Sequence, residues 1–367
     1  MTKMCTRRRW LRQAGGALAA AVAGTPAGAA PAAEEFERGG MIYRRLGQTD
    51  LFVSLLLLGS HTDPAFKIRL KDHNMLNEEG QRRRDRLVAH ALDRGVNVID
   101  TYESEGQWEP VARVVRPRRD KVLVSICRQF PMFVGKHIDL AARLYGHVDL
   151  YRIYLGDGPQ VDQKILEDWD VMRKAKAAGK VRAIGISTHS ERMMVSALDQ
   201  LEGLDYILFP YNFIHARADY SQFLPAAIRK GVGLVAMKPL AAGSIARLDP
   251  RAGSASAPEN ERIQLYQARN RPIHPAVVRE LTRSLGRLPE ETLCQAALRF
   301  VYSRPFLSCT IPGIFGEELL EQNYAAMRRD RENGGWETAA PGTVRQVLGG
   351  QAGWLPRRYG WLREWSA

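Results

Sequence analysis

Short apolar runs alternate with longer amphipathic segments along most of the chain. Eight of these runs are rich in β-branched or aromatic residues, as expected of strands that are buried on both faces. We therefore predict strands at 52–58, 96–100, 121–127, 148–154, 182–187, 206–210, 233–238 and 307–311.

The segments between these runs place apolar residues at helical spacing. Helices are predicted at 78–94, 163–178, 190–201, 220–230, 290–302 and 316–327. Gly95, Gly179 and Gly231 each follow a predicted helix and precede a predicted strand, where a glycine typically ends a helix. Repeated βα units of this length favour an α/β fold, a closed (βα)8 TIM barrel. No G-x-G-x-x-G follows the first predicted strand, which argues against a Rossmann-type open sheet.

The N-terminal segment has the features of an export signal. Residues 6–12 place arginines before an apolar pair and a further basic residue, which is the twin-arginine pattern. The Ala/Gly-rich stretch 14–30 and small residues at two cleavage positions follow, and this stretch is too short and too weakly apolar for a stable membrane span. We predict a signal peptide at 1–33, passage through the twin-arginine translocation machinery, and a periplasmic or other extracytoplasmic location.

The barrel pattern occupies 34–330, and two segments stand outside its repeat. Residues 244–289 are too long for an ordinary βα loop, so we expect a short helix near 275–285 over the barrel mouth. Residues 331–367 hold four of the seven tryptophans. This C-terminal extension is predicted either to pack on the barrel wall or to serve as a lid or partner surface.

The chain is strongly basic, with a formal net charge of +13 and a pI of about 9.8. The arginine runs at 82–84 and 116–119 contain no aromatic residues, so we interpret them as solvated surface and predict no nucleic-acid partner. The four cysteines form no C-x-x-C pair, and the histidines show no metal-ligand spacing. Neither a metal site nor a disulfide scaffold is therefore predicted.

Six fragments, in order along the chain, resemble the aldo/keto reductase family. MIYRRLGQTDLFVSLLLLG is similar to the family's opening hairpin and first strand, and ALDRGVNVIDT to its second βα unit. GKVRAIGIS, PYN, GVGLVAMKPLAAG and IPGIFGEELLEQN are similar to its fifth to eighth strand regions. The resemblance covers residues 41–330. It implies a barrel with an N-terminal hairpin, a nicotinamide cofactor, and hydride transfer between that cofactor and a carbonyl or alcohol substrate.

The same resemblance implies a catalytic tetrad of aspartate, tyrosine, lysine and histidine. Asp100 occupies the aspartate position, whereas Glu105 stands at the tyrosine position, Cys127 at the lysine position and Tyr154 at the histidine position. An ionised carboxylate donates no proton at pH 7, so Glu105 could act as the donor only if burial kept it protonated. Most of the usual tetrad is thus replaced.

Other side chains offer a replacement for the missing donor. Tyr154 and Lys238 end the fourth and seventh predicted strands and could form a displaced phenol–ammonium pair. Arg128 could hold an anionic substrate or bind Asp100. For each, a purely structural role is the alternative. The candidate catalytic residues are Asp100, Glu105, Arg128, Tyr154 and Lys238.

The cofactor-binding positions that the resemblance implies are Ser187, Tyr211, Asn212, Pro239, Leu240, Pro312, Gly313 and Asn323. Around them Thr188 replaces an asparagine, Leu208 a glutamine and Met237 the aromatic residue that stacks on nicotinamide. Glu317 and Glu318 lie near the position of the adenosine 2′-phosphate and would repel it. NAD is therefore favoured over NADP, and a loss of cofactor binding stays open.

Three functions are compatible with these residues. The first is an aldo/keto-reductase-like oxidoreductase acting on a small-molecule substrate. The second is an exported barrel without redox turnover that binds a small ligand or a partner protein. The third is a barrel enzyme of another class that uses Asp100, Glu103 and Glu105 as general acid–base groups. The resemblance favours the first as the class of protein.

Overall fold

The structure is a computed structural model and describes residues 33–68, 75–101, 105–128, 133–156, 158–213, 222–241, 245, 279, 283 and 286–332. The predicted signal peptide up to residue 32, nearly all of the 244–289 insertion and the tail beyond residue 332 lie outside these ranges. The predictions made for them stay predictions. Among the described residues, no helix is long and apolar enough to cross a membrane.

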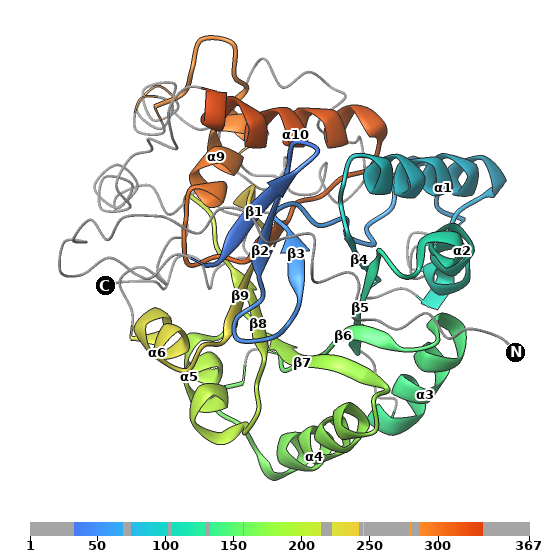
Figure 1. Ribbon diagram of the computed structural model, residues 1–367, viewed down its shortest axis with the longest axis vertical. Coiled ribbons are helices and arrows are strands. Elements are labelled where there is room, and N and C mark those ends of the chain that lie inside the picture. The colour runs from blue at the N-terminus through green and yellow to red at the C-terminus, as the bar shows by residue number, and fades with distance from the viewer. Residues whose placement is uncertain are drawn as a thin grey trace, which may run out of the picture. The chain divides into compact units, whose positions relative to one another are not determined.

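Seven parallel strands form a curled sheet in the order β10-β9-β8-β7-β6-β5-β4 (Figure 1). They are β4 (Val98–Asp100), β5 (Leu123–Arg128), β6 (Val148–Tyr154), β7 (Val181–Ser187), β8 (Tyr206–Pro210), β9 (Gly233–Met237) and β10 (Cys309–Ile311). Each overlaps one of the predicted strands, and 148–154 and 206–210 match to the residue. The buried parallel strands are thus confirmed.

The segment after β3 (Phe52–Ser54) fills the eighth position of the barrel. Leu56 forms a parallel bridge with Thr310 of β10, and Leu58 forms one with Ile99 of β4. The amide of Leu57 donates to the carbonyl of Thr310 at 3.0 Å. The (βα)8 barrel prediction is therefore confirmed, although the predicted strand 52–58 is divided between two sheets.

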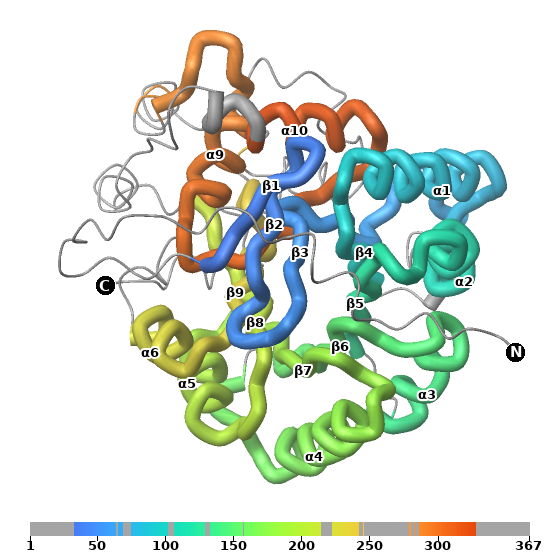
Figure 2. The backbone as a smooth tube through the Cα atoms, viewed as in Figure 1, coloured from blue at the N-terminus to red at the C-terminus, as the bar shows by residue number. Residues whose placement is uncertain are grey.

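Helices surround the parallel strands in chain order (Figure 2). They are α1 (Glu78–Asp93), α2 (Glu105–Val115), α3 (Val134–Tyr145), α4 (Gln163–Ala177), α5 (Glu191–Gln200), α6 (Phe223–Arg229), α9 (Leu293–Tyr302) and α10 (Glu317–Glu332), with short 3-10 turns η2 (Pro64–Phe66) and η3 (Arg116–Arg118). The helical pattern did not predict α2 and α3, and α2 contains Pro110, which is unusual inside a helix. Gly95, Gly179 and Gly231 all have positive φ, which confirms them as helix ends.

A small antiparallel sheet closes the barrel at the N-terminal ends of its parallel strands. It consists of β1 (Glu35–Arg38), β2 (Met41–Arg45) and β3, and it includes the expected N-terminal hairpin. The buried guanidinium of Arg44 donates to the carbonyls of Tyr302, Arg304 and Leu307, just before β10 begins. Gly47 touches the first residue of β9, because a Cβ there would lie 2.4 Å from the amide nitrogen of Gly233. The small sheet thus covers the N-terminal ends of the strands and leaves their C-terminal ends for the site.

Two apolar cores flank the strands. The barrel interior holds a compact cluster near the small sheet, and a larger core fills the space between the strands and the helices. The interior cluster comprises Leu46, Leu51, Val53, Leu57, Val98, Leu150, Ala183, Tyr206, Leu208, Val235 and Cys309. Toward the C-terminal ends of the strands, the interior becomes polar.

Candidate functional site

A buried ion pair occupies the barrel interior beneath the mouth. Arg152 of β6 donates from Nη1 to Asp100 Oδ1 at 2.6 Å and from Nη2 to Asp100 Oδ2 at 2.9 Å. Ser125 of β5 donates its hydroxyl to Asp100 Oδ1 at 2.6 Å and accepts from Arg152 Nη1 at 2.9 Å. Both charged side chains are almost fully buried, and Asp100 is 1% exposed. A carboxylate held in this way positions Arg152 and is not presented to a substrate.

The geometry of the strands brings this pair together. Side chains two residues apart on a strand point to the same face. Asp100 is the Cα partner of Ser125, and Cys127 is the partner of Arg152. Burial lowers the pKa of Arg152, but the neighbouring Asp100 carboxylate outweighs it and raises that pKa well above its usual value. The guanidinium therefore stays charged.

A tyrosine from β8, two strands along the sheet from β6, approaches the same guanidinium. Burial raises the pKa of Tyr206, and Arg152 works against that shift. The ring fits because Gly185 has no side chain, since a Cβ there would lie 2.6 Å from a ring carbon of Tyr206. The Gly185–Tyr206 contact thus helps to fill the interior next to the ion pair.

Cys127 and Ser187 lie side by side above the ion pair. Their Sγ and Oγ atoms are 3.7 Å apart, and both residues are about 4% exposed. Cys127 is a free thiol, as are Cys294 and Cys309. The cysteine side chain leaves room for the larger guanidinium of Arg152 on the neighbouring strand.

Three side chains meet at the C-terminal ends of β6, β7 and β9. Tyr154 Oη lies 3.4 Å from His189 Nδ1, and the other imidazole nitrogen, Nε2, is in hydrogen-bond contact with Lys238 Nζ. The tyrosine and histidine rings pack edge to face with centroids 5.8 Å apart. The predicted phenol–ammonium pair is therefore joined through a histidine. At 3.4 Å, the contact between the Tyr154 phenol and His189 is long for a hydrogen bond.

The contact with Lys238 determines the histidine tautomer. Burial, with Lys238 adding to it, lowers the pKa of His189 to about 3, so the ring is neutral at pH 7. Because an ammonium group only donates, His189 Nε2 must accept from Lys238. The ring proton then resides on Nδ1 and points to Tyr154 Oη. The phenol accepts this contact, and its own O–H can donate to another group.

The backbone around Lys238 is held in an uncommon conformation. Lys238 has φ of 55° and Ala241 of 50°, in the left-handed region that non-glycine residues seldom adopt. The side-chain amide of Asn212 donates to the carbonyl of Lys238 at 3.0 Å, and the amide of Tyr211 donates to the carbonyl of Met237. Asn212 therefore orients Lys238.

Other predicted site residues lie away from this constellation. Arg128 points toward the helices and donates to Asp168 of α4 at 2.7 Å, so Asp100 has Arg152 as its partner instead. Tyr211 is fully buried and stacks on Phe300 of α9, which places its ring in the helix-side core. Glu105 is the first residue of α2, and its side chain lies outside the part of the chain that the structure describes. Tyr102, Glu103 and Ser104 lie outside the described residues.

The remaining cofactor positions lie at the ends of β9 and β10. Pro239 and Pro312 are buried, Leu240 is half-buried against the core, and Gly313 is exposed. Asn323 of α10 is 6% exposed, and its Nδ2 has no hydrogen-bond partner within the described part of the chain. An orphaned amide of this kind fits a ligand with an acceptor. The hydroxyl of Thr188 donates to the carbonyl of Gly156 at 2.7 Å.

Sequence reasoning assigned no catalytic role to two residues of this site. Arg152 stands inside the apolar run VDLYRIY, two residues before Tyr154 and on the same face, and that alternation could have revealed it. His189 follows Ser187 by two residues, but its partners come from strands distant in sequence. No cluster of three or more metal-ligating side chains occurs in the described ranges.

Comparisons with known proteins agree with this architecture. The model of the aldo/keto reductase family matches residues 143–332. An uncharacterized oxidoreductase of Bacillus subtilis, YrpG, is 24% identical over 361 residues, covering 88% of this chain and all of the relative. The holo form of aldo-keto reductase AKR11C1 from Bacillus halodurans superposes with a TM-score of 0.59 at 19% identity, covering 83% of this chain and 95% of that one. An aldo/keto reductase from Klebsiella pneumoniae, in complex with NADP and acetate, gives 0.56 at 20% identity, covering 83% and 93%.

Proposed function

Because the chain belongs to the aldo/keto reductase family, we propose that it transfers hydride between a nicotinamide cofactor and a carbonyl or alcohol, with Tyr154 as the proton donor. The observation that carries this proposal is the contact of Tyr154 with His189 and of His189 with Lys238 at the mouth. A phenol, an imidazole and an ammonium group in successive contact supply what carbonyl reduction needs besides hydride.

In the direction of reduction, a bound nicotinamide would supply the hydride, and the chain must supply a proton. The O–H of Tyr154 donates to the carbonyl oxygen as negative charge develops there. The phenolate that remains accepts from His189 Nδ1–H, and the charge of Lys238 behind the imidazole stabilises it. The hydrogen bond from Asn212 and the left-handed backbone at Lys238 keep the ammonium group in contact with the imidazole of His189. In the oxidation direction the same phenolate takes the proton back.

The Asp100–Arg152 pair supports the donor from below. Arg152 precedes Tyr154 by two residues on the same face of β6, so the guanidinium lies beneath the phenol. With its charge matched by Asp100, Arg152 fills the interior without adding net charge to it. We assign the pair a positioning role.

The chain's own residues fit a nicotinamide cofactor in part. Ser187 at the end of β7 would face the nicotinamide amide, and the orphaned Nδ2 of Asn323 would face the adenine end. Glu317 and Glu318 are exposed beside that end and disfavour a 2′-phosphate, so we propose NAD over NADP. Titration of the purified protein with NADH and with NADPH, followed by cofactor fluorescence, tests this preference. No binding of either at millimolar concentration would reject the cofactor and the reaction.

The donor assignment is tested with three variants and two matched controls. Tyr154→Phe, His189→Gln and Lys238→Met should each lower kcat for carbonyl reduction, the first by about 10²–10⁴-fold as expected for loss of a general acid. Tyr145→Phe changes a buried group and Lys230→Met an exposed one, both in the helix layer, and both should leave kcat unchanged. Equal kcat in Tyr154→Phe and wild type would remove Tyr154 from the mechanism.

We also propose export through the twin-arginine route, supported by the pattern at residues 6–12. The measurement is the distribution of the full chain between periplasmic and cytoplasmic fractions of a bacterial host. Arg8→Lys/Arg9→Lys should retain the protein in the cytoplasm. Unchanged export of that double variant would contradict the twin-arginine route.

A further inference from the structure

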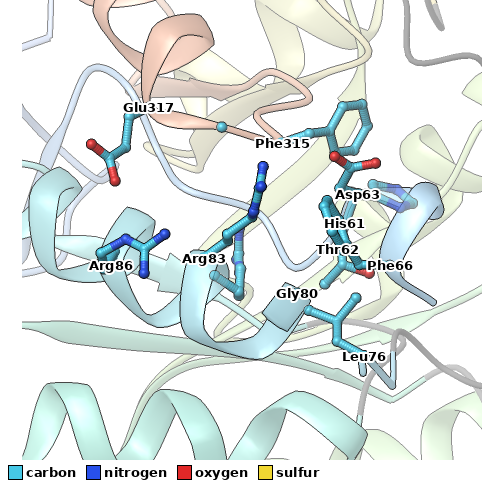
Figure 3. Close-up of a pocket in the computed structure, with 12 residues that line it drawn as sticks. His61, Thr62, Asp63, Phe66, Leu76, Gly80, Arg83, Arg86, Phe315 and Glu317 are labelled. Carbon is cyan, nitrogen blue, oxygen red and sulfur yellow. The ribbon is translucent and has the colours of Figure 1, made fainter. Parts of the chain in front are cut away.

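We propose that a pocket at the rim of the barrel binds a small oxyanion, such as a carboxylate or phosphate group, with Arg84 of α1 as its anchor. The pocket lies between the loop after residue 58, the first half of α1 and the segment after β10 (Figure 3). Its volume is about 220 Å³, which suffices for a small organic anion. Neither the residues of the donor constellation nor those of the buried ion pair line it, and of the residues placed at or beside the cofactor only Glu317 does.

Arg84 is a buried cation with unused donors. It is 4% exposed, and its Nη2 donates to the carbonyl of Gly59 at 2.5 Å. Its Nε and Nη1 are buried and have no hydrogen-bond partner among the residues that the structure describes. Burying a charged group with unsatisfied donors costs several kcal/mol or more, so a chain that does so at a pocket wall has a reason to bind an anion there.

Within the described part of the chain, no carboxylate forms an ion pair with Arg84. Burial lowers the pKa of Arg84 to about 10, and Asp85 partly offsets that shift, so the group is still protonated at pH 7. The carboxylate of Asp85 accepts from Gln81 at 2.6 Å and lies 3.9 Å from Arg113 of α2. A ligand anion would therefore complete the hydrogen bonding of Arg84.

The other charged side chains limit the charge of the ligand. Arg83 donates to Glu79 and lies over the ring of Phe66. In Figure 3, Arg86 and Glu317 lie on one side of the pocket and Asp63 on the other. With Arg83 matched by Glu79, Arg84 and Arg86 stand against the two lining carboxylates, which suits a single negative charge better than a multiply charged group.

The apolar walls suit an organic ligand. Phe66, Leu76 and Phe315 line the pocket beside the charged groups. Phe66 packs against the helix because Gly80 has no side chain, since a Cβ there would lie 2.3 Å from the Cβ of Phe66. The mixture of an arginine anchor and apolar walls fits a short carboxylic acid, and a phosphate ester is the alternative source of the oxyanion.

The test is calorimetric titration of the full chain, in a buffer free of oxyanions, with butyrate and with inorganic phosphate. Wild type should bind one of them, and Arg84→Met should weaken that binding about ten- to hundredfold, the range for losing charge-assisted hydrogen bonds. Arg82→Met is the matched control, because Arg82 belongs to the same arginine run but is 60% exposed and outside the pocket. Its affinity should equal that of wild type.

Thermal unfolding separates binding from a structural role. Without oxyanion, Arg84→Met should be at least as stable as wild type, because it removes a buried cation with unsatisfied donors. When the anion is added, wild type and Arg82→Met should gain stability and Arg84→Met should not. Should Arg84→Met fail to fold, Arg84→Lys decides: weakened binding supports the anchor, and full affinity overturns it. Binding of butyrate or of phosphate identifies the source. Binding of neither at millimolar concentration, or equal binding by Arg84→Met, overturns the proposal.

Discussion

The buried ion pair beneath the mouth can be broken by one substitution, Arg152→Met. The variant removes the two hydrogen bonds to Asp100, of 2.6 and 2.9 Å, and the one to Ser125, of 2.9 Å. Because Asp100 is 1% exposed, water does not replace the lost hydrogen bonds. The carboxylate of Asp100 keeps the hydrogen bond that it accepts from Ser125 Oγ. Removing one partner of a buried pair costs about 3–5 kcal/mol. We expect that loss in the free energy of unfolding.

The measurement is urea unfolding followed by far-ultraviolet circular dichroism, for wild type, Arg152→Met, Asp100→Leu and the double variant. Replacing both charges by apolar groups is often nearly neutral, so the double variant should be more stable than the sum of the single effects implies, by about 2 kcal/mol or more. Lys174→Met is the control, because its pair with Asp170 has the same 2.6 Å distance but side chains that are 76% and 53% exposed. It should cost below about 1 kcal/mol. A loss below about 1 kcal/mol in Arg152→Met, or additive single effects, would refute the reasoning.

Three further predictions concern protonation and packing. In the folded protein the pKa values of His137 and His189 are about 4 and about 3, below the ordinary value of 6.5. As pH falls below 6.5, the unfolded chain therefore takes up protons before the folded one does. The free energy of unfolding should fall by about 1.4 kcal/mol per pH unit for each histidine. Urea unfolding at pH 7 and pH 5 measures this, and His137→Gln should reduce the loss; an unchanged slope would count against it. The pH profile of kcat/KM should show no ionisation of His189 near 6.5, and a limb there that disappears in His189→Gln would contradict its neutral burial. Gly185→Ala should destabilise the fold by about 1–3 kcal/mol, because its Cβ would lie 2.6 Å from the Tyr206 ring, and a neutral effect would show that the interior can rearrange.

Most of the barrel could be predicted because its elements have local causes. Strands such as 148–154 are continuous apolar runs, and helix ends such as Gly95 need a left-handed residue. The small sheet shows the limit, since 52–58 looks like one strand but divides between two sheets at Ser54. Pairing partners distant in sequence decide that division, and no local pattern encodes them.

The arginine run at 82–84 shows the same limit for charge. A run of three arginines indicates solvated surface, and Arg82 and Arg83 are indeed largely exposed. Arg84 is buried instead, because it shares the inward face of α1 with Gly80, Leu87, Val88 and Ala91. Helical phase therefore overrides the average character of the run. In the site, Tyr154 and Lys238 could be predicted as candidates because they stand at strand ends. The position of His189 between them depends on the conformation of the loop after β7.

The resemblance assigns the catalytic tetrad to particular strands. The groups that meet inside the barrel and at its mouth come partly from other strands. Cys127 stands where a lysine is expected, and its Cα partner in the β5–β6 ladder is Arg152, so Asp100 keeps a cationic partner supplied by the adjacent strand. A lysine at 127 beside the guanidinium would bring two cations to one carboxylate in a dry interior, which is unfavourable. The same end of the barrel also holds a phenol, an imidazole and an ammonium group in contact. Loss of the expected residues one by one is therefore weak evidence for loss of activity, because the chemistry depends on which groups meet and not on which strand supplies them.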